Sequence, residues 1–391
     1  MLRGLPTRKP VETLKVLQEL GQGLKLTDKN RISRVVGSAT LVKNLTLAVL
    51  TALLCFVAAE VGTRISLGGP WPERLPLLRV RADEHLGWVM LPRDFHYTYD
   101  IPVRLNSLGF RSPEIEIEKA DDNEFRILAI GDSHIYGQGV ADSELATARM
   151  ETSLKSAGLQ AVRVVNLGVR AYSLRQYSAV LETVGSLLDP DYILLFFYIN
   201  DFKDEDVDRA YREKKDLDWY TFDLSGKPTG DRLRSWKWLQ LFRKSAFVMW
   251  GHDALRLWSH KDSLESQILS GRHDSKVDRS LRAAESYFEE VRGTVAAIGV
   301  PCSVVIIPVS AQIVSPSGPI RYQDLVRRMA REAGLDSIDL LEAFQSDYAL
   351  SGRVPVIPYD GHYDGHGQSV MGTAVADHLL PRIGGLRMEG N

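Results

Sequence analysis

FRILAIGDSHIYG, residues 125–137, is the stretch that decides the fold of this 391-residue chain. Its first part, Phe125 to Ile130, is a short apolar run that stops at Gly131, which is typical of a strand buried on both faces. The next residues, Asp132 and Ser133, are of types favoured in turns and at helix N-termini. We therefore expect a buried strand that turns tightly into a helix and exposes the serine hydroxyl at the turn.

The alternation of apolar runs and amphipathic segments continues toward the C-terminus. Strands are expected at about 162–167, 192–199, 303–309 and 337–340, and helices at about 144–157, 173–188, 280–298, 320–333 and 368–380. Continuous apolar strands separated by helices indicate a parallel sheet that is covered on both faces. The sequence thus predicts an α/β fold with a doubly wound, flavodoxin-like sheet, in which sites form at the carboxyl ends of the strands.

Two regions depart from this alternation. Residues 66–122 contain many prolines and are expected to be a connector with short strands, before a main domain at 123–385. Residues 202–276 begin with mixed charges and then gather aromatic side chains, including five tryptophans: Trp219, Trp236, Trp238, Trp250 and Trp258. We interpret them as an inserted helical segment with a small aromatic core; a lid over the site or a surface that dips into a membrane is the alternative.

Residues 45–62, LTLAVLTALLCFVAAEVG, contain a single charge, Glu60. A membrane-spanning helix needs about 20 mostly apolar residues, so we predict a transmembrane anchor at 45–65. Nine Lys and Arg against three acidic residues in the first 43 positions predict a basic cytoplasmic tail at 1–44, with a short helix near 11–20. The chain is then a single-pass protein of the inner (cytoplasmic) membrane whose main domain is periplasmic or extracellular. A buried soluble helix and a cleaved signal peptide are the alternatives.

Charge and cysteine usage exclude other classes. The net charge is −2, without the basic footprint that nucleic-acid binding usually leaves. The two cysteines, Cys55 and Cys302, form neither a CxxC motif nor a Cys/His cluster. We expect no nucleic-acid partner, no structural zinc and no cofactor.

Two further strand ends carry residues suited to binding an anionic oxygen. Gly168 follows the second strand, where a glycine lets its backbone N–H approach a substrate oxygen closely. Asn200 and Asp201 follow the third strand, and an Asn amide can donate to a developing oxyanion, a contribution of about 3 kcal/mol for comparable donors. Taken alone, the glycine is equally consistent with an ordinary turn, and an Asn-Asp pair is more often just the start of a loop.

The C-terminal stretch DGHYDGHG, residues 360–367, supplies candidate proton-transfer groups. A nucleophilic hydroxyl needs a base to accept its proton and an acidic partner that fixes the tautomer of the base. His362 and Asp360 can fill these roles, and His366 with Asp364 is a second candidate pair. The same four side chains could instead bind a metal.

The order of these four blocks resembles that of the SGNH (GDSL-like) hydrolase family, whose conserved Ser, Gly, Asn and His fall here at Ser133, Gly168, Asn200 and His362. The resemblance implies that the serine attacks an ester carbonyl, with His362 as base and Asp360 as its partner. It also implies an oxyanion hole made by the N–H groups of Ser133 and Gly168 and by the Asn200 side chain. It covers about residues 125–380 without the aromatic insertion.

Upstream residues resemble the membrane-anchored bacterial members of that family. Glu60 and Arg64 stand where such members carry Glu and Arg at the outer end of their helix, and NSLGFR at 106–111 is similar to their N-S-x-G-[FY]-R stretch. The resemblance implies a serine esterase or O-acyltransferase that acts on ester groups, O-acetyl above all, of an envelope carbohydrate or lipid. Whether water or a sugar hydroxyl accepts the acyl group is not encoded in these residues.

The chain departs from the family pattern at two positions. Tyr198 replaces the glycine of the usual G-x-N-D block, and Asp360 precedes His362 with one residue between them where the family usually has two. We prefer His362 to His366 because its surroundings resemble the run from the catalytic loop into the last helix. Two other hypotheses stay open: a catalytically inactive carbohydrate-binding module on the same fold, and a metal-dependent hydrolase that uses the 360–366 cluster.

Overall fold

The computed structural model describes residues 40–66, 80–83, 85–93, 95–119, 121, 123–202, 242–259, 263–272, 274–315, 320–358 and 360–389. The chain divides into two units, residues 1–69 and 70–391. The expected helix near 11–20 and residues 203–241 of the aromatic insertion lie outside the described residues.

The described part of the first unit is one helix, Thr40–Ser66, with 27 residues. At 1.5 Å per residue it is about 40 Å long, enough to cross a hydrocarbon core of about 30 Å. No part of its most apolar stretch is buried within the protein. Near its C-terminal end Arg64 forms an ion pair with Glu60 at 2.6 Å. The helix is therefore long and apolar enough to span a membrane.

The second unit is built on a five-stranded parallel sheet with the order β6-β5-β7-β8-β9. Counted along the chain from β5, this order is 2-1-3-4-5, which is that of flavodoxin-like doubly wound folds. The strands are β5 (Phe125–Ile130), β6 (Val162–Asn166), β7 (Tyr192–Phe197), β8 (Cys302–Ile306) and β9 (Asp336–Asp339). Every residue of β5, β7 and β8 is buried, as expected of strands covered on both faces.

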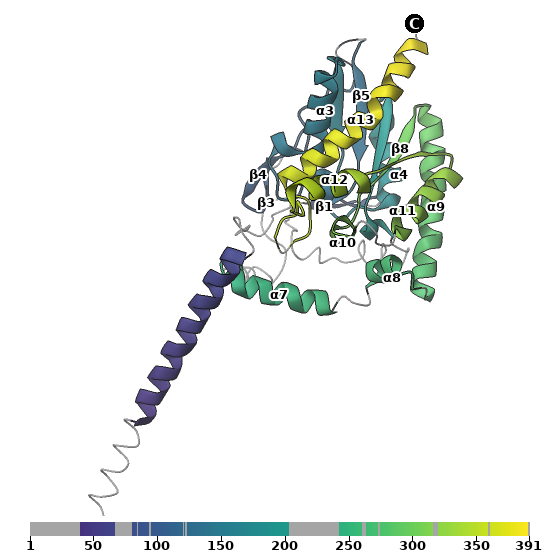
Figure 1. The fold of residues 1–391 in the computed structure, drawn as a ribbon. Coiled ribbons are helices and arrows are strands. Elements are labelled where there is room, and N and C mark those ends of the chain that lie inside the picture. Colours follow the sequence, from purple (N-terminus) through teal and green to yellow (C-terminus); the bar gives the residue numbers. More distant parts are fainter. Residues whose placement is uncertain are drawn as a thin grey trace, which may run out of the picture. The chain divides into compact units, whose positions relative to one another are not determined.

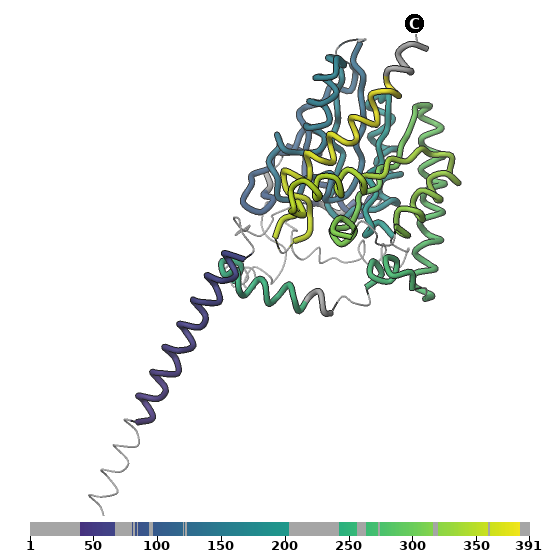
Figure 2. The backbone as a smooth tube through the Cα atoms, viewed as in Figure 1, coloured from purple at the N-terminus to yellow at the C-terminus, as the bar shows by residue number. Residues whose placement is uncertain are grey.

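Helices cover both faces of this sheet (Figures 1 and 2). Ile127 and Ala129 of β5 face a cluster with residues of α3 (Ala146–Ser156), α12 (Leu341–Ser351) and α13 (Gly365–Glu389). Leu128 and Ile130 face the other cluster, with residues of α4 (Leu174–Thr183), α8 (Leu264–Ser270), α9 (Ser275–Ile298) and α11 (Arg321–Glu332). The described residues also form the helices α2 (Ser133–Tyr136), α7 (Ala246–Ser259) and α10 (Ser310–Ile313). Alternate residues of one strand thus anchor the two helical layers.

The region expected to be a connector contributes to this core. It forms two antiparallel hairpins, β1 (Val80–Asp83) with β2 (Gly87–Met90) and β3 (Phe95–Thr98) with β4 (Ile101–Arg104). Trp88 and Val103 of these hairpins are buried in the same cluster as Leu128 of the central strand. The buried residues of the two hairpins therefore pack with the core of the sheet domain.

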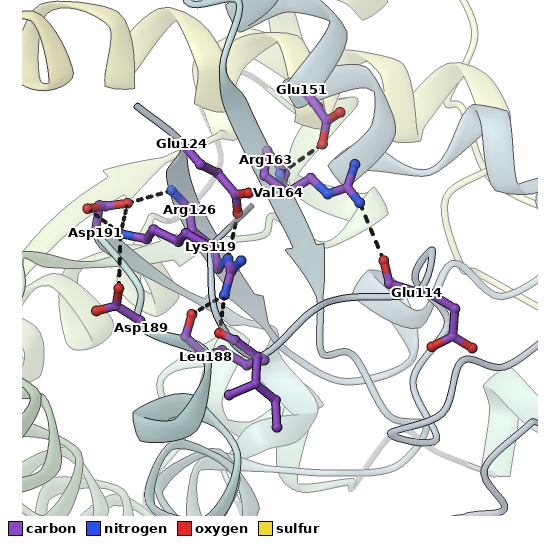
Figure 3. A network of polar contacts seen from close by, with 11 residues as sticks. Glu114, Lys119, Glu124, Arg126, Glu151, Arg163, Val164, Leu188, Asp189 and Asp191 are labelled. Carbon is purple, nitrogen blue, oxygen red and sulfur yellow. Dashed lines mark hydrogen bonds and ion pairs between the residues drawn. The ribbon is translucent and has the colours of Figure 1, made fainter. Parts of the chain in front are cut away.

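A polar network connects Lys119 and Glu124 to the amino ends of β5 and β7 (Figure 3). Arg126, with an exposed fraction of 2%, pairs with Glu124 at 2.7 Å and donates to the Leu188 carbonyl at 2.5 Å. Lys119 pairs with Asp191 at 2.9 Å, and the same carboxylate accepts the Arg126 N–H at 2.6 Å. The Glu124 carboxylate therefore compensates the charge of this buried arginine, and the network holds the starts of β5 and β7 together.

The expected doubly wound sheet is confirmed. Its strands and most of its helices fall within a few residues of the predicted ranges, whereas α13 runs on to Glu389, well beyond the expected end near residue 380. Helix α12 was not foreseen, because its eleven residues carry neither a capping side chain nor a clear apolar stripe. The segment after 242 holds α7 and α8, which agrees with the helical character expected of the insertion.

Candidate active site

Three loops at the carboxyl edge of the sheet meet at one hydroxyl group. The Ser133 Oγ lies 2.7 Å from Nε2 of His362, and Nδ1 of the same ring lies 2.9 Å from Oδ1 of Asp360. Ser133 follows β5, whereas the other two residues lie in the loop before α13. The fold thus brings together a hydroxyl, an imidazole and a carboxylate separated by 229 residues of sequence.

The strand-to-helix turn presents the serine. Gly131 is required there, because a Cβ would lie 2.7 Å from Cγ1 of Ile135. Asp132 caps α2 by accepting the His134 N–H at 2.8 Å, and the helix ends at Gly137 with φ 77°. As the first residue of α2, Ser133 has no intrahelical acceptor for its own N–H. Ser133 thus carries a backbone N–H donor as well as the hydroxyl group.

The C-terminal loop presents the base. Gly361 has φ 90°, a left-handed conformation that glycine adopts without strain, and it joins Asp360 to His362. The next residue, Tyr363, is buried and donates to the Pro308 carbonyl at 2.5 Å. The His362 carbonyl accepts the Ile357 N–H at 2.8 Å. Backbone and side-chain anchors on both sides of the imidazole therefore fix its position.

The contacts define how protons are arranged along this chain of groups. An ionised Asp360 can only accept, so Nδ1 of His362 carries the proton, and Nε2 is left as an acceptor. The Ser133 hydroxyl then donates to Nε2 at 2.7 Å, in preference to the Asp132 carboxylate at 3.3 Å. This is the arrangement in which the imidazole can remove the serine proton.

Asp360 is held in its charged form despite its burial. Burial by itself raises the pKa of this carboxyl, but the attraction of His362 and hydrogen bonds from His362, Tyr99 and Gln138 outweigh it. The net effect holds the pKa of Asp360 well below its usual range. Near neutral pH the carboxylate therefore stays ionised and can accept the hydrogen bond from the imidazole.

The third loop places Asn200 beside the nucleophile. Its Nδ2 donates to Oδ2 of Asp132 at 3.1 Å, the same oxygen that faces the Ser133 hydroxyl at 3.3 Å. Asp201 closes this loop by accepting the Tyr198 N–H at 2.9 Å and the Tyr177 hydroxyl at 3.0 Å. The amide of Asn200 thus reaches the nucleophile turn, with a second N–H that Asp132 does not use.

Tyr198 occupies the position at which the family pattern has a glycine. Its ring packs on the buried imidazole of His134, with 4.1 Å between centroids. The His134 ring in turn lies 4.8 Å from that of His362. The rings of Tyr198, His134 and His362 therefore lie next to one another in this order. Residues 199–201 still form a short 3-10 helical turn, although Tyr198 replaces the glycine of the family pattern.

Gly168 lies in the loop after β6, against the backbone of α2. Its N–H donates to Oδ1 of Asn166 at 2.8 Å, so this donor is already engaged within its own loop. A Cβ at this position would lie 2.3 Å from the backbone nitrogen of Tyr136 and 2.6 Å from the carbonyl carbon of Ile135. The absence of a Cβ at Gly168 therefore lets the loop after β6 pack directly on the backbone of α2.

The second candidate pair is turned away from the nucleophile. His366 Nε2 lies 2.8 Å from Oδ1 of Asp347, and the imidazole is 48% exposed. Asp364 pairs with Arg353 and caps the start of α13 through the His366 N–H. Within the part of the chain that the structure describes, no three His, Cys, Asp or Glu side chains converge as metal ligands would. Of these two imidazoles, that of His362 is the one within hydrogen-bond distance of the Ser133 hydroxyl.

The NSLGFR stretch, residues 106–111, contacts the C-terminal end of α2, the helix that begins at Ser133. Asn106 Oδ1 accepts the backbone N–H groups of Leu108 and Phe110, which closes a tight turn. Arg111, 1% exposed, then donates to the carbonyls of Tyr136, Gly137 and Val140 at 3.1, 2.6 and 2.6 Å and pairs with Asp142. A guanidinium at the C-terminal end of α2 satisfies carbonyls that have no intrahelical partner.

Three residues of this site escaped the sequence reasoning. His134 follows Ser133 directly, and its position in the GDSH block was the only signal for it. Burial lowers the pKa of His134 to about 4, so its imidazole is neutral near pH 7. Tyr99 and Gln138, which both contact Asp360, lie 261 and 222 residues before it in the chain, and no local pattern marks them.

Comparison with known proteins adds little to this geometry. No family model matches the chain, and no curated protein matches it. Among solved structures, it resembles LAE5, an α/β hydrolase enzyme from the metagenome of Lake Arreo in Spain, at 16% identity and a TM-score of 0.40, over 66% of this chain and 96% of that one. It also resembles Axe2, an acetylxylan esterase from Geobacillus stearothermophilus, at 15% identity and a TM-score of 0.39, over 65% of this chain and 94% of that one.

A third similar structure is the lipase/acylhydrolase from Enterococcus faecalis, with 13% identity and a TM-score of 0.38, over 66% of this chain and 96% of that one. Identities and TM-scores this low carry no conclusion about activity. The function therefore rests on the arrangement of the side chains themselves.

Proposed function

We propose that this protein is a serine esterase or O-acyltransferase that works through an acyl-enzyme on Ser133. The observation that carries the proposal is the continuous chain from the Ser133 hydroxyl to His362 at 2.7 Å and on to Asp360 at 2.9 Å. A hydroxyl, a base and an oriented carboxylate in this order are what nucleophilic acyl transfer requires. A binding module needs no such order of groups.

The chemistry follows from these contacts. His362 Nε2 accepts the hydroxyl proton while Oγ bonds to the ester carbonyl carbon, and the carbonyl π electrons move to its oxygen. The Ser133 N–H and the Asn200 amide donate to that oxyanion. Collapse of the intermediate breaks the bond to the alcohol, which leaves with the proton from His362. Water or an acceptor hydroxyl then attacks the acyl-enzyme, with His362 again taking the proton, and Ser133 is regenerated.

The proposed substrate is an acylated carbohydrate or lipid of the cell envelope, with O-acetyl as the preferred group. We further propose that the helix Thr40–Ser66 anchors the protein as a single-pass protein in the inner membrane, with the catalytic domain on the periplasmic or extracellular side. The apolar length of that helix and the basic residues before it support this placement. A reporter active only outside the cytoplasm, fused after residue 391, should be active; an inactive reporter in a well-expressed fusion contradicts it.

Hydrolysis of p-nitrophenyl acetate tests the nucleophile. The Ser133→Ala variant of the full chain in detergent should lose nearly all activity, whereas Ser270→Ala, at an exposed serine of α8, should retain it. Full activity in Ser133→Ala would remove this residue from the mechanism. Transfer of labelled acetyl groups to oligosaccharide acceptors, compared with release of free acetate, then separates transferase from esterase.

A further inference from the structure

The carboxylate of Asp360 is held from two directions. Its Oδ1 lies 2.9 Å from Nδ1 of His362, whereas its Oδ2 accepts hydrogen bonds from the hydroxyl of Tyr99 and from Nε2 of Gln138, the latter at 2.8 Å. Gln138 Nε2 also lies 3.2 Å from the Tyr99 oxygen. Oδ2 therefore has two donors from parts of the chain far from the C-terminal loop.

Tyr99 reaches this oxygen from an unusual backbone position. It lies in the turn of the β3–β4 hairpin with φ 57°, a left-handed conformation that costs a bulky residue roughly 1–2 kcal/mol, and it is only 6% exposed. Its ring lies under the guanidinium of Arg243, 5.1 Å from the centroid. Such strain persists only where the surrounding contacts outweigh it.

The hairpin is fixed to the loop that carries Gln138. The Gly139 N–H donates to Oγ1 of Thr98 at 2.7 Å, and a Cβ at Gly139 would lie 2.2 Å from Cδ1 of Ile357. The hairpin, the loop after α2 and the loop before His362 are therefore in direct contact around Asp360. A segment that the sequence marks only as a connector thus supplies part of the catalytic centre.

We propose that Tyr99 and Gln138 are positioning residues that hold the Asp360 carboxylate in its orientation toward His362. The inference rests on the proposed function and adds to it. With a single residue between Asp360 and His362, the loop alone offers the carboxylate few anchors, and the two outside donors supply them. Burial and the nearby Asp360 charge raise the pKa of Tyr99, so its hydroxyl stays protonated and remains a donor throughout the working range.

Other charged and titratable groups face this cluster. His362 is the direct partner of Asp360, and His134 and Tyr198 feel its charge from behind. Arg170 and Arg243 act on Tyr99 and favour its ionised form, but burial and Asp360 dominate. None of these groups contributes a second carboxylate, so a carboxylate introduced at position 138 changes the local charge sharply.

Two substitutions separate positioning from mere packing. Tyr99→Phe keeps the ring and removes the donor, and we expect kcat/KM to fall about tenfold, as for loss of one hydrogen bond to a charged group. Gln138→Glu places a carboxylate beside Oδ2, so the pair takes up a proton at higher pH. The acid limb of kcat/KM against pH should then move toward neutrality by about one unit or more. Tyr192→Phe, which removes another buried phenol contact, at 2.7 Å to Ser303, is the matched control and should keep the wild-type profile.

The pH dependence of the unfolding free energy tests the inference without an activity assay. Because the folded pKa of Asp360 is depressed, its contribution to stability is present above the unfolded value, about 3.9, and is lost as the pH falls through the folded value. The stability difference between wild type and Tyr99→Phe should therefore shrink below about pH 4. The difference between wild type and Tyr192→Phe should stay constant.

The outcomes distinguish the inference from the proposed function. Shifted pH profiles in Gln138→Glu, with the pH-dependent stability difference in Tyr99→Phe, support it. An active wild type overturns the inference alone if its folded Tyr99→Phe variant keeps the wild-type kcat/KM and its folded Gln138→Glu variant keeps the wild-type pH profile. A folded wild type with no esterase or transferase activity, but with the stability difference intact, overturns the proposed function and the positioning role together.

Discussion

Gly168→Ala probes the contact between the loop after β6 and the nucleophile helix. The added Cβ would lie 2.3 Å from the Tyr136 nitrogen and 2.6 Å from the Ile135 carbonyl carbon, where ordinary contacts begin at 3.4 Å. Backbone atoms cannot rotate away as a side chain can, so α2 and the loop must separate by about 1 Å. Ser133 begins that helix, and its 2.7 Å contact with His362 must change with it.

The magnitude follows from the size of this displacement. Overpacking of a close contact typically costs about 1–3 kcal/mol of stability. A 1 Å misplacement of a reacting group can reduce turnover by about 100-fold. We therefore expect Gly168→Ala to lower the unfolding temperature and to reduce kcat for p-nitrophenyl acetate by one to two orders of magnitude, roughly.

Gly293→Ala supplies the matched control. Gly293 lies in α9, and a Cβ there meets nothing within 4 Å. The same chemical change should raise stability by roughly 0.5–1 kcal/mol, because alanine favours the helix, and leave activity unchanged. Wild-type activity and stability in Gly168→Ala would refute the close-packing explanation for this glycine.

Three other predictions follow from the same contacts. Asn200→Ala should lower kcat about 100-fold with little change in KM, because its amide serves the transition state; an unchanged kcat in steady-state assays would exclude it from the oxyanion hole. Arg111→Met should cost about 3–5 kcal/mol in denaturant unfolding, since it removes the guanidinium donors of three carbonyls and the partner of Asp142. Arg292→Met, at an exposed ion pair, should cost under about 1 kcal/mol. Burial lowers the pKa of His134 to about 4, so as the pH falls the unfolded chain binds a proton at this imidazole before the folded protein does. The wild type should therefore lose on the order of 3 kcal/mol of unfolding free energy between about pH 6.5 and 4. His134→Phe should flatten this pH dependence, and an unchanged pH dependence in the variant would contradict the buried, neutral state of His134.

Local patterns were sufficient to predict the sheet and the residues at its strand ends. FRILAI is buried throughout because a central parallel strand needs apolar residues on both faces, and the turn chemistry of Gly131 and Asp132 is local to the chain. The chain order of Ser133, Asn200 and His362 then indicated which loops meet. The structure brings these three loops together at the carboxyl edge of the sheet.

Contacts between distant segments could not be predicted in the same way. The role of Gly168 depends on which backbone lies against its Cα, and a glycine that binds an oxyanion looks the same in sequence as one that permits close packing. Tyr99 reaches Asp360 across 261 residues through a hairpin turn with φ 57°, and neither property follows from hydrophobic periodicity. Long-range polar contacts of this kind require the folded structure.

The most direct test of Ser133 as the nucleophile is mass spectrometry of the full-length protein after treatment with a fluorophosphonate probe. A single adduct on the peptide containing Ser133, absent in Ser133→Ala and strongly reduced in His362→Ala, is the expected result. Absence of any adduct in the folded wild-type protein, or an adduct on a different residue that persists in Ser133→Ala, would contradict the assignment.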